Sequence, residues 1–155
     1  MDWTVEQMMR LGSCYDEAKF VELWGGAESL TTAQFLDSEA PVADRAYIVT
    51  LMLDDATLRL WACDMLEAAD PDKLLAPVED LAKLISDARA AVEEGHGEAW
   101  YREQWCELRG TFGGARALFH WRGGAAARLA YKATHTREPD NAEELLGLLR
   151  QRIEE

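Results

Sequence analysis

Apolar side chains return at every third or fourth position along most of this chain, a spacing that places them on one face of an α-helix. The pattern is clearest in residues 77–94, where Pro77 suits a first helical turn and charged residues lie outside the apolar stripe. The stripe is formed by Val78, Leu81, Ile85, Ala88 and Val92. The same spacing predicts further helices over residues 3–11, 15–24, 31–36, 41–52, 54–68 and beyond Pro139.

Residues that begin or end helices stand at the edges of these segments. Thr31 or Thr32 is suited to cap the N-terminus of its helix, and so is Asp54 or Asp55. Helix stops are expected at Gly25-Gly26, at Pro71 and at Gly95-His96-Gly97. Asp140 and Glu143 have the spacing of a capping box for the last helix. The predicted helices are therefore short and separated by tight turns.

One segment has the composition of a strand. Ile48, Val49 and Thr50 are all β-branched, but no turn-bounded partner strand lies near them in the sequence, so we predict a helix there as well. With no hairpin signal and no linker, the sequence predicts an all-α fold. We expect a multi-helix bundle of about seven to nine helices that forms a single domain over residues 1–155.

Residues 98–135, called the ribbon below, differ from the other segments in being rich in Trp, Ala, Gly and Arg. Aromatic and arginine positions each recur every seven residues, as on two faces of a long helix. These positions are Trp105, Phe112, Phe119 and Ala126 on one side and Arg102, Arg109 and Arg116 on the other. Interior glycines cost a helix up to about 1 kcal/mol each. Either the helix breaks at Gly113-Gly114 and Gly123-Gly124, or neighbouring backbones approach it closely; we favour at least one break.

Charge is distributed unevenly between the ribbon and the remaining chain. Residues 99–137 hold seven basic and two acidic side chains, whereas all other residues hold nine basic and 27 acidic ones, which together give the net charge of −13. The arginines and aromatics resemble a stacking platform for single-stranded nucleic acid. We favour an internal helix whose arginines pair with the chain's own carboxylates. Because nucleic-acid binding needs net positive charge, we expect no direct nucleic-acid partner.

The sequence carries no pattern typical of a catalytic, cofactor or metal site. The histidines His96, His120 and His135 share no helical face, and the cysteines Cys14, Cys63 and Cys106 have no metal-ligand spacing. No glycine-rich segment continues into a phosphate-binding loop. Cys106 and His120 could form a nucleophilic pair only if the fold brought them together, and their spacing in the sequence gives no support for this. We therefore expect no enzyme, no cofactor and no metal, and reduced thiols in the cytoplasm. Without an apolar stretch of membrane-spanning length, we also expect no membrane association.

The order of residues from Gly12 to Ala69 resembles a known family. The matching residues are Cys14-Tyr15, Glu22-Leu23-Trp24-Gly25-Gly26, Glu28-Ser29-Leu30-Thr31, Pro41-Val42, Asp44-Arg45 and the run from Leu58 to Asp64. This pattern resembles a family of helical immunity proteins linked to bacterial toxin systems and also met among phage-associated genes. The ribbon stands where that family has a long tract rich in Ala, Trp and Arg. The resemblance implies a stoichiometric binder that neutralises a toxin, with no active site to transfer.

These expectations combine into a small acidic cytoplasmic protein that binds a basic protein partner, either a toxin or a nucleic-acid-binding complex. A nuclease, whose substrate groove must be positive, is a partner that suits an acidic surface. The residues expected to contact it are the outer acids of the 77–94 helix: Glu79, Asp80, Asp87, Glu93 and Glu94. Three alternatives remain: a phage-encoded acidic decoy of a nucleic-acid-binding defence complex, an enzyme or sensor that binds an anion at the arginines, and an architectural subunit.

Overall fold

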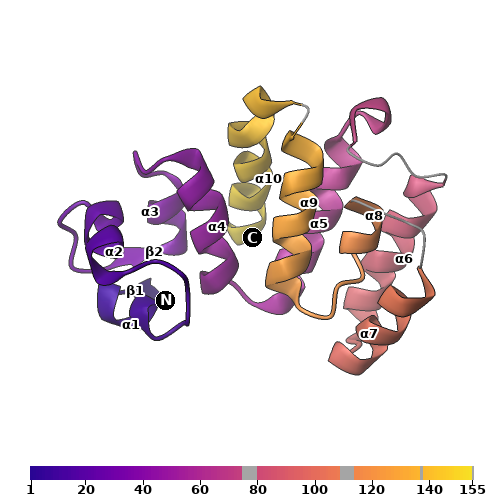
Figure 1. Ribbon diagram of the computed structural model, residues 1–155, viewed down its shortest axis with the longest axis horizontal. Coiled ribbons are helices and arrows are strands. Elements are labelled where there is room, and N and C mark those ends of the chain that lie inside the picture. Colours follow the sequence, from indigo (N-terminus) through magenta and orange to yellow (C-terminus); the bar gives the residue numbers. More distant parts are fainter. Residues whose placement is uncertain (75–79, 109–113, 137, 155) are drawn as a thin grey trace. The chain divides into compact units, whose positions relative to one another are not determined.

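The computed structural model describes residues 1–74, 80–108, 114–136 and 138–154, and its secondary structure is almost entirely helical (Figure 1). The predicted all-α multi-helix fold is confirmed. The chain groups into two compact units, Met1–Leu53 and Asp54–Glu155, each with a core of its own. The single domain over residues 1–155 stays a prediction.

The first unit contains four short helices and a minimal antiparallel pair of strands. Its elements are β1 (Asp2–Trp3), α1 (Val5–Met9), α2 (Glu17–Trp24), β2 (Leu30–Thr31), α3 (Thr32–Leu36) and α4 (Val42–Met52). Aromatic rings fill its core: Trp24 stacks on Phe35 with ring centroids 5.2 Å apart, and the edge of Phe20 meets Trp24. The Trp24 indole donates a hydrogen bond of 2.9 Å to the carbonyl of Trp3, which ties α2 to β1.

In this unit the predicted end of α2 and the predicted N-cap of α3 are confirmed, whereas the helix predicted over residues 3–11 spans only Val5–Met9, because Trp3 pairs with Leu30 in the β1–β2 strands. Thr31 caps α3, with Gln34 completing a reciprocal capping box. Gly25 ends α2 in the left-handed conformation, with φ of 60°. Residues 48–50 are helical despite their branched side chains, because α4 packs on α3 instead of joining a sheet. The two-residue strands were not predicted, since they are too short to leave an alternating pattern.

Polar contacts in the first unit fix α4 to the turns before it. The Tyr15 hydroxyl donates a hydrogen bond to Asp44, which also pairs with Lys19 at 3.2 Å. Burial and the Asp44 carboxylate raise the pKa of Tyr15. The largely buried Arg45 donates to the carbonyl oxygens of Ala40 and Leu36 at 2.8 and 3.0 Å. These residues thus hold the unit together.

The second unit is built around one helix, α5, on which α6, α9 and α10 pack. Its elements are α5 (Asp55–Ala68), the 3-10 turn η1 (Pro71–Lys73), α6 (Leu81–Glu94), α7 (Glu98–Glu107), α8 (Gly114–Ala117), α9 (Gly123–His135), the 3-10 turn η2 (Pro139–Asn141) and α10 (Ala142–Glu154). Asp54 caps α5 as predicted, accepting the Thr57 N–H at 2.9 Å. The fully buried Trp61 donates to the carbonyl of Leu145 at 2.8 Å, joining α5 to α10.

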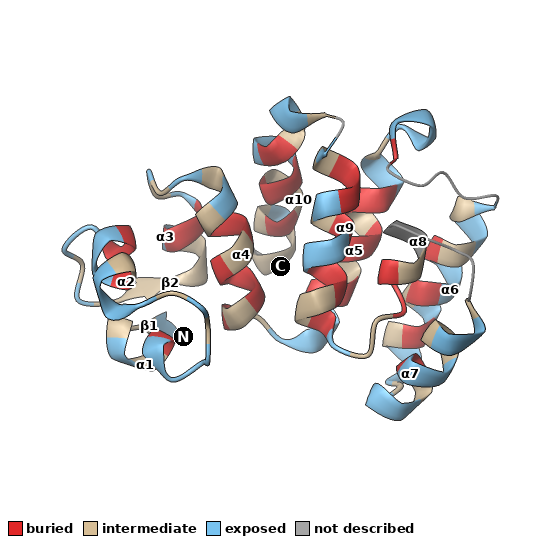
Figure 2. Cartoon of the chain, viewed as in Figure 1, coloured by how far each residue is buried: buried red, intermediate tan, exposed pale blue. Residues whose placement is uncertain are grey.

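The described part of the ribbon contains the helices α7, α8 and α9. Residues 118–122, between α8 and α9, are not helical, so the predicted break is confirmed before Gly123, whereas Gly113 lies outside the described residues. Close packing explains one of its glycines. A Cβ added at Gly123 would lie 2.7 Å from the backbone oxygen of Asp55, too close for any side chain. Figure 2 shows the buried face of α9 against α5, formed by the small residues Gly123, Ala126, Ala127, Ala130 and Ala133. Both readings of the glycines therefore hold at Gly123, where α9 begins and its backbone lies close to Asp55.

In the second unit, two predicted helix starts differ from the structure. Residues 77–79 lie outside the described residues, and the described α6 begins at Leu81, preceded by Asp80 in the left-handed conformation with φ of 62°. The last helix begins at Ala142, because Pro139 and Asp140 belong to the 3-10 turn η2. The residue directly before α10 is therefore Asn141, and the predicted cap residue Asp140 lies one position earlier.

Candidate binding grooves beside helix α6

Helix α6 carries three of the five predicted contact acids, Asp87, Glu93 and Glu94, and is buried on one side only. Its inward face consists of Ile85, Ala88 and Ala91, and its outward face includes exposed small residues at Ser86 and Ala90. An apolar stripe with a charged opposite face is the reason why this sequence forms a surface helix. A groove lies on each side of it.

The first groove, called the α6–α7 groove, has a volume of about 370 Å³. Its walls are apolar side chains from both helices and from Phe119, and three carboxylates line it: Asp87 and Glu94 of α6 and Glu107 of α7. The described residues that line it are Leu84, Asp87, Ala90, Ala91, Glu94, Trp100, Gln104, Glu107, Leu108 and Phe119. An apolar floor beside several carboxylates suits a ligand that is itself apolar and cationic.

The carboxylates of the α6–α7 groove are only partly neutralised within the chain. Asp87 pairs with Lys83 at 2.7 Å, and this exposed contact raises the pKa of Lys83. Glu94 lies 2.6 Å from the Nε2 atom of His96, whose ring stacks on Trp100 at a centroid distance of 4.1 Å. Among the described residues, Glu107 has no ion-pair partner. The groove therefore keeps negative charge available to a partner.

The second groove, called the α5–α6 groove, has a volume of about 500 Å³ and lies on the other side of α6. Its apolar lining comes from Leu66, Pro71, Leu81 and Ile85, and its charged lining from Glu67, Arg89 and Glu93. Ala90 lines both grooves and therefore forms the ridge between them. The two grooves together make one acidic and apolar face around the outer side of α6.

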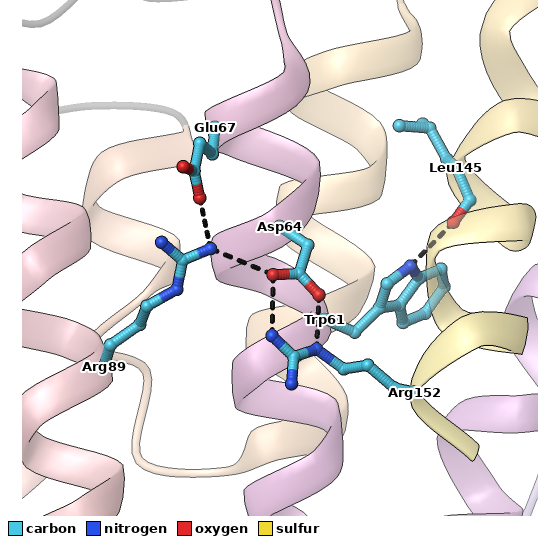
Figure 3. Close-up of polar contacts among 6 residues, drawn as sticks. All are labelled: Trp61, Asp64, Glu67, Arg89, Leu145 and Arg152. Carbon is cyan, nitrogen blue, oxygen red and sulfur yellow. Dashed lines mark hydrogen bonds and ion pairs between the residues drawn. The ribbon is translucent and has the colours of Figure 1, made fainter. Parts of the chain in front are cut away.

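Arg89 adds little positive charge to this face, because its guanidinium is engaged by two acids of α5. Figure 3 shows Arg89 between Asp64, at 2.9 Å, and Glu67. On its other side Asp64 accepts a two-pronged contact from Arg152 of α10, one prong measuring 2.7 Å. Asp64 thereby holds α6 and α10 to α5 through two arginines. Glu67 and Glu93 are both exposed in the α5–α6 groove, but Glu67 pairs with Arg89, whereas Glu93 has no ion-pair partner among the described residues.

The structure distributes the five predicted contact acids unequally. Asp87 and Glu94 line the α6–α7 groove, and Glu93 lines the α5–α6 groove. Asp80 is exposed ahead of α6 and lines neither groove, whereas Glu79 lies outside the described residues. Glu107 was missed, because it stands in the basic ribbon and meets the acids of α6 only through folding.

Two arginines of the ribbon, Arg102 and Arg116, contact other residues of the ribbon. Arg102 pairs with Glu98 at 2.8 Å, as expected for an arginine near the chain's own acids, and lies 5.0 Å from the ring of Trp121. Arg116 instead lies over the ring of Trp105 at 4.0 Å and donates to its carbonyl oxygen at 3.3 Å. Arg109 is outside the described residues. Arg89 and Arg152, which join α6 and α10 to α5 through Asp64, lie outside the ribbon.

The other candidate chemistry stays unassembled in the described part of the chain. His120 stacks on Trp121 at 4.0 Å, and burial together with nearby arginines lowers its pKa, while no hydrogen bond joins it to the exposed Cys106. No group of three His, Cys, Asp or Glu side chains there is placed to hold a metal ion. Among the same residues, none of the helices is both long enough and apolar enough to span a membrane.

Comparisons with known proteins give no relative from which a role could be transferred. No family model, no curated protein and no solved structure matches the chain. The functional argument therefore rests on the two grooves and on the charge of the chain.

Proposed function

We propose that this chain is a cytoplasmic inhibitor of the immunity-protein type, which binds a basic protein stoichiometrically through the face around α6. The observation that carries the proposal is the α6–α7 groove, where three carboxylates line an apolar floor. The net charge of −13 supports it, because complementary charge raises the association rate and disfavours acidic competitors. The family resemblance adds two points to this proposal: the partner is a toxin, and the gene is phage-associated.

The anion-binding alternative receives less support. Arg102 and Arg116 contact a carboxylate, two tryptophan rings and a backbone carbonyl. An anionic ligand would have to replace those contacts. A partner at α6 instead meets acids that are exposed and only partly paired.

The test uses a charge reversal at the groove and a matched reversal elsewhere. The groove variant is Asp87→Lys, Glu94→Lys and Glu107→Lys; the control is Glu22→Lys, Glu28→Lys and Glu39→Lys, three exposed acids of the first unit. Both variants change the net charge equally. Wild type and variants serve as bait in a lysate of the source organism, and each captured protein is identified, purified and titrated.

We expect wild type to bind one basic protein at a ratio of one to one and to inhibit its activity. The groove variant should bind about a hundredfold more weakly, mainly through slower association with a weaker salt dependence. The control variant should keep most of the affinity. Equal binding by wild type and groove variant, or an acidic partner, would contradict the proposal.

A further inference from the structure

The outer side of α6 has the shape of a crossing point for a second helix. Two grooves flank it, and the exposed Ala90 between them contributes only a methyl group. Ser86, one helical turn earlier, is equally small and exposed. A chain segment that crosses α6 here can approach its backbone closely and reach into both grooves.

We infer that the partner presents an amphipathic basic helix, which crosses α6 at Ala90 and places apolar side chains in both grooves. This inference rests on the proposed function, since it specifies the partner of the same face. The spacing fits a helix. Two apolar residues seven positions apart lie two turns, or about 11 Å, from one another, close to the diameter of about 10 Å of the helix to be crossed.

The charges around the crossing point specify a basic helix. Glu67 and Glu93 line one groove, and Asp87, Glu94 and Glu107 line the other. The two cations of α6 are already paired: Lys83 with Asp87, and Arg89 with Asp64 and Glu67. Lysine or arginine on both flanks of the apolar stripe would meet carboxylates on both sides of α6. An acidic or purely apolar helix would desolvate Glu93 and Glu107, which have no ion-pair partner among the described residues.

Helix-in-groove recognition usually relies on a few apolar anchors at helical spacing. The α6–α7 groove offers Trp100 and Phe119 as walls for one anchor, and the α5–α6 groove offers Leu66 and Ile85 for the other. Each groove has a volume within the range of small-ligand pockets, which is ample for a leucine or an aromatic side chain. The anchors should therefore carry most of the affinity and the flanking charges most of the selectivity.

The experiment uses a designed probe and one substitution at the crossing point of the protein. The probe is an amidated peptide of about 16 residues, made of Leu and Lys with helical period. Its controls are the same composition in alternating order and a Leu–Glu peptide of helical period. Ala90→Gln blocks the crossing point and keeps every charge, and Ala18→Gln makes the same change at an exposed alanine of α2. Binding is measured by calorimetry and by tryptophan fluorescence.

We expect the helical Leu–Lys peptide to bind wild type and Ala18→Gln one to one, and to bind Ala90→Gln about tenfold more weakly or worse. Equal affinity for Ala90→Gln, or equal binding of the alternating peptide, overturns the inference. If the native partner is lost with the charge reversal but kept by Ala90→Gln, the crossing helix is wrong and the proposed function stands. Concentration-dependent dimers that Ala90→Gln abolishes would make a second copy the occupant and overturn the inference.

Discussion

Helices α6 and α9 both pack on α5, and both are rich in small residues, but they use those residues in opposite ways. On α9 the small side chains face α5, where Ala126, Ala127 and Ala130 are fully buried (Figure 2). On α6 small residues such as Ser86 and Ala90 face outward, and a groove lies on each side. Small side chains thus permit close approach in both helices. In α9 the close approach is made by α5 of the same chain. In α6 the small residues remain open to a partner.

The largest expected effect comes from replacing one alanine on each helix and comparing the loss of stability. Ala130→Leu on α9 should lower the free energy of unfolding by about 3 kcal/mol, because three extra carbons have no space between α9 and α5. Ala90→Leu on α6 should change it by less than about 0.5 kcal/mol, because that position is exposed. Urea unfolding measures both. Similar losses in the two variants would refute the comparison.

A smaller effect is expected where α9 begins. Gly123→Ala should destabilise the fold by about 2 kcal/mol, because the new Cβ would collide with Asp55. Gly147 of α10 is the matched control, since a Cβ there meets nothing within 4 Å. Gly147→Ala should therefore stabilise the protein by up to about 1 kcal/mol. Thermal unfolding should show melting temperatures shifted in opposite directions, and a tolerated Gly123→Ala would argue against the close contact.

The attachment of α6 to α5 can be tested at Asp64. Asp64→Asn removes the charge that Arg89 and Arg152 share and should cost about 1–2 kcal/mol. The cost falls short of that for a fully buried pair, because the side chain of Asp64 is 16% exposed. Glu103→Gln on the exposed side of α7 serves as the control and should have little effect. A double-mutant cycle with Arg152→Met should give a coupling energy above zero; no coupling would contradict the network.

The smallest expected effect appears only at alkaline pH. Burial raises the pKa of Cys63 on α5 to about 11, whereas an unfolded thiol ionises near pH 8.5. Above about pH 9 the unfolded state therefore loses protons that the folded state keeps, and stability must fall as pH rises. The stability advantage of wild type over Cys63→Ala should narrow between pH 9 and 10, by less than about 1.4 kcal/mol per pH unit. A constant difference across that range would contradict the buried thiol.

The sequence predicted most of the helices because their signals are local. The caps at Thr31 and Asp54 and the stop at Gly25 act through neighbours within a few residues, so no knowledge of the fold was needed. The β1–β2 pair escaped prediction because it depends on two residues of each strand meeting across the first unit. The start of the 77–94 helix was placed too early for the described residues, since Asp80 leaves the helical conformation.

The candidate site was predictable only in part, for the same reason. Charge along α6 identified Asp87, Glu93 and Glu94, because helical spacing alone places them outside the apolar stripe. Glu107 and the aromatic wall at Trp100 became visible only once α7 had folded beside α6. The net charge also suggested that the ribbon's arginines pair with carboxylates of the chain. A net charge does not say where the charged residues lie in the fold, and Arg116 contacts Trp105 instead. Among the quoted residues of the family resemblance, Tyr15, Asp44 and Arg45 have structural contacts in the first unit.

The carboxylate of Asp55 also determines what the basic ribbon can bind. It accepts the first N–H of α9 from Gly123 and pairs with the buried Arg59, so it sits where an outside phosphate would seek a helix N-terminus. An external anion would be competing with a ligand tethered to the same chain, whose effective concentration is of millimolar order or higher. The protein thus supplies its own occupant for the most favourable anion position that its basic segment offers. Free phosphate at cellular levels should leave α9 unaffected.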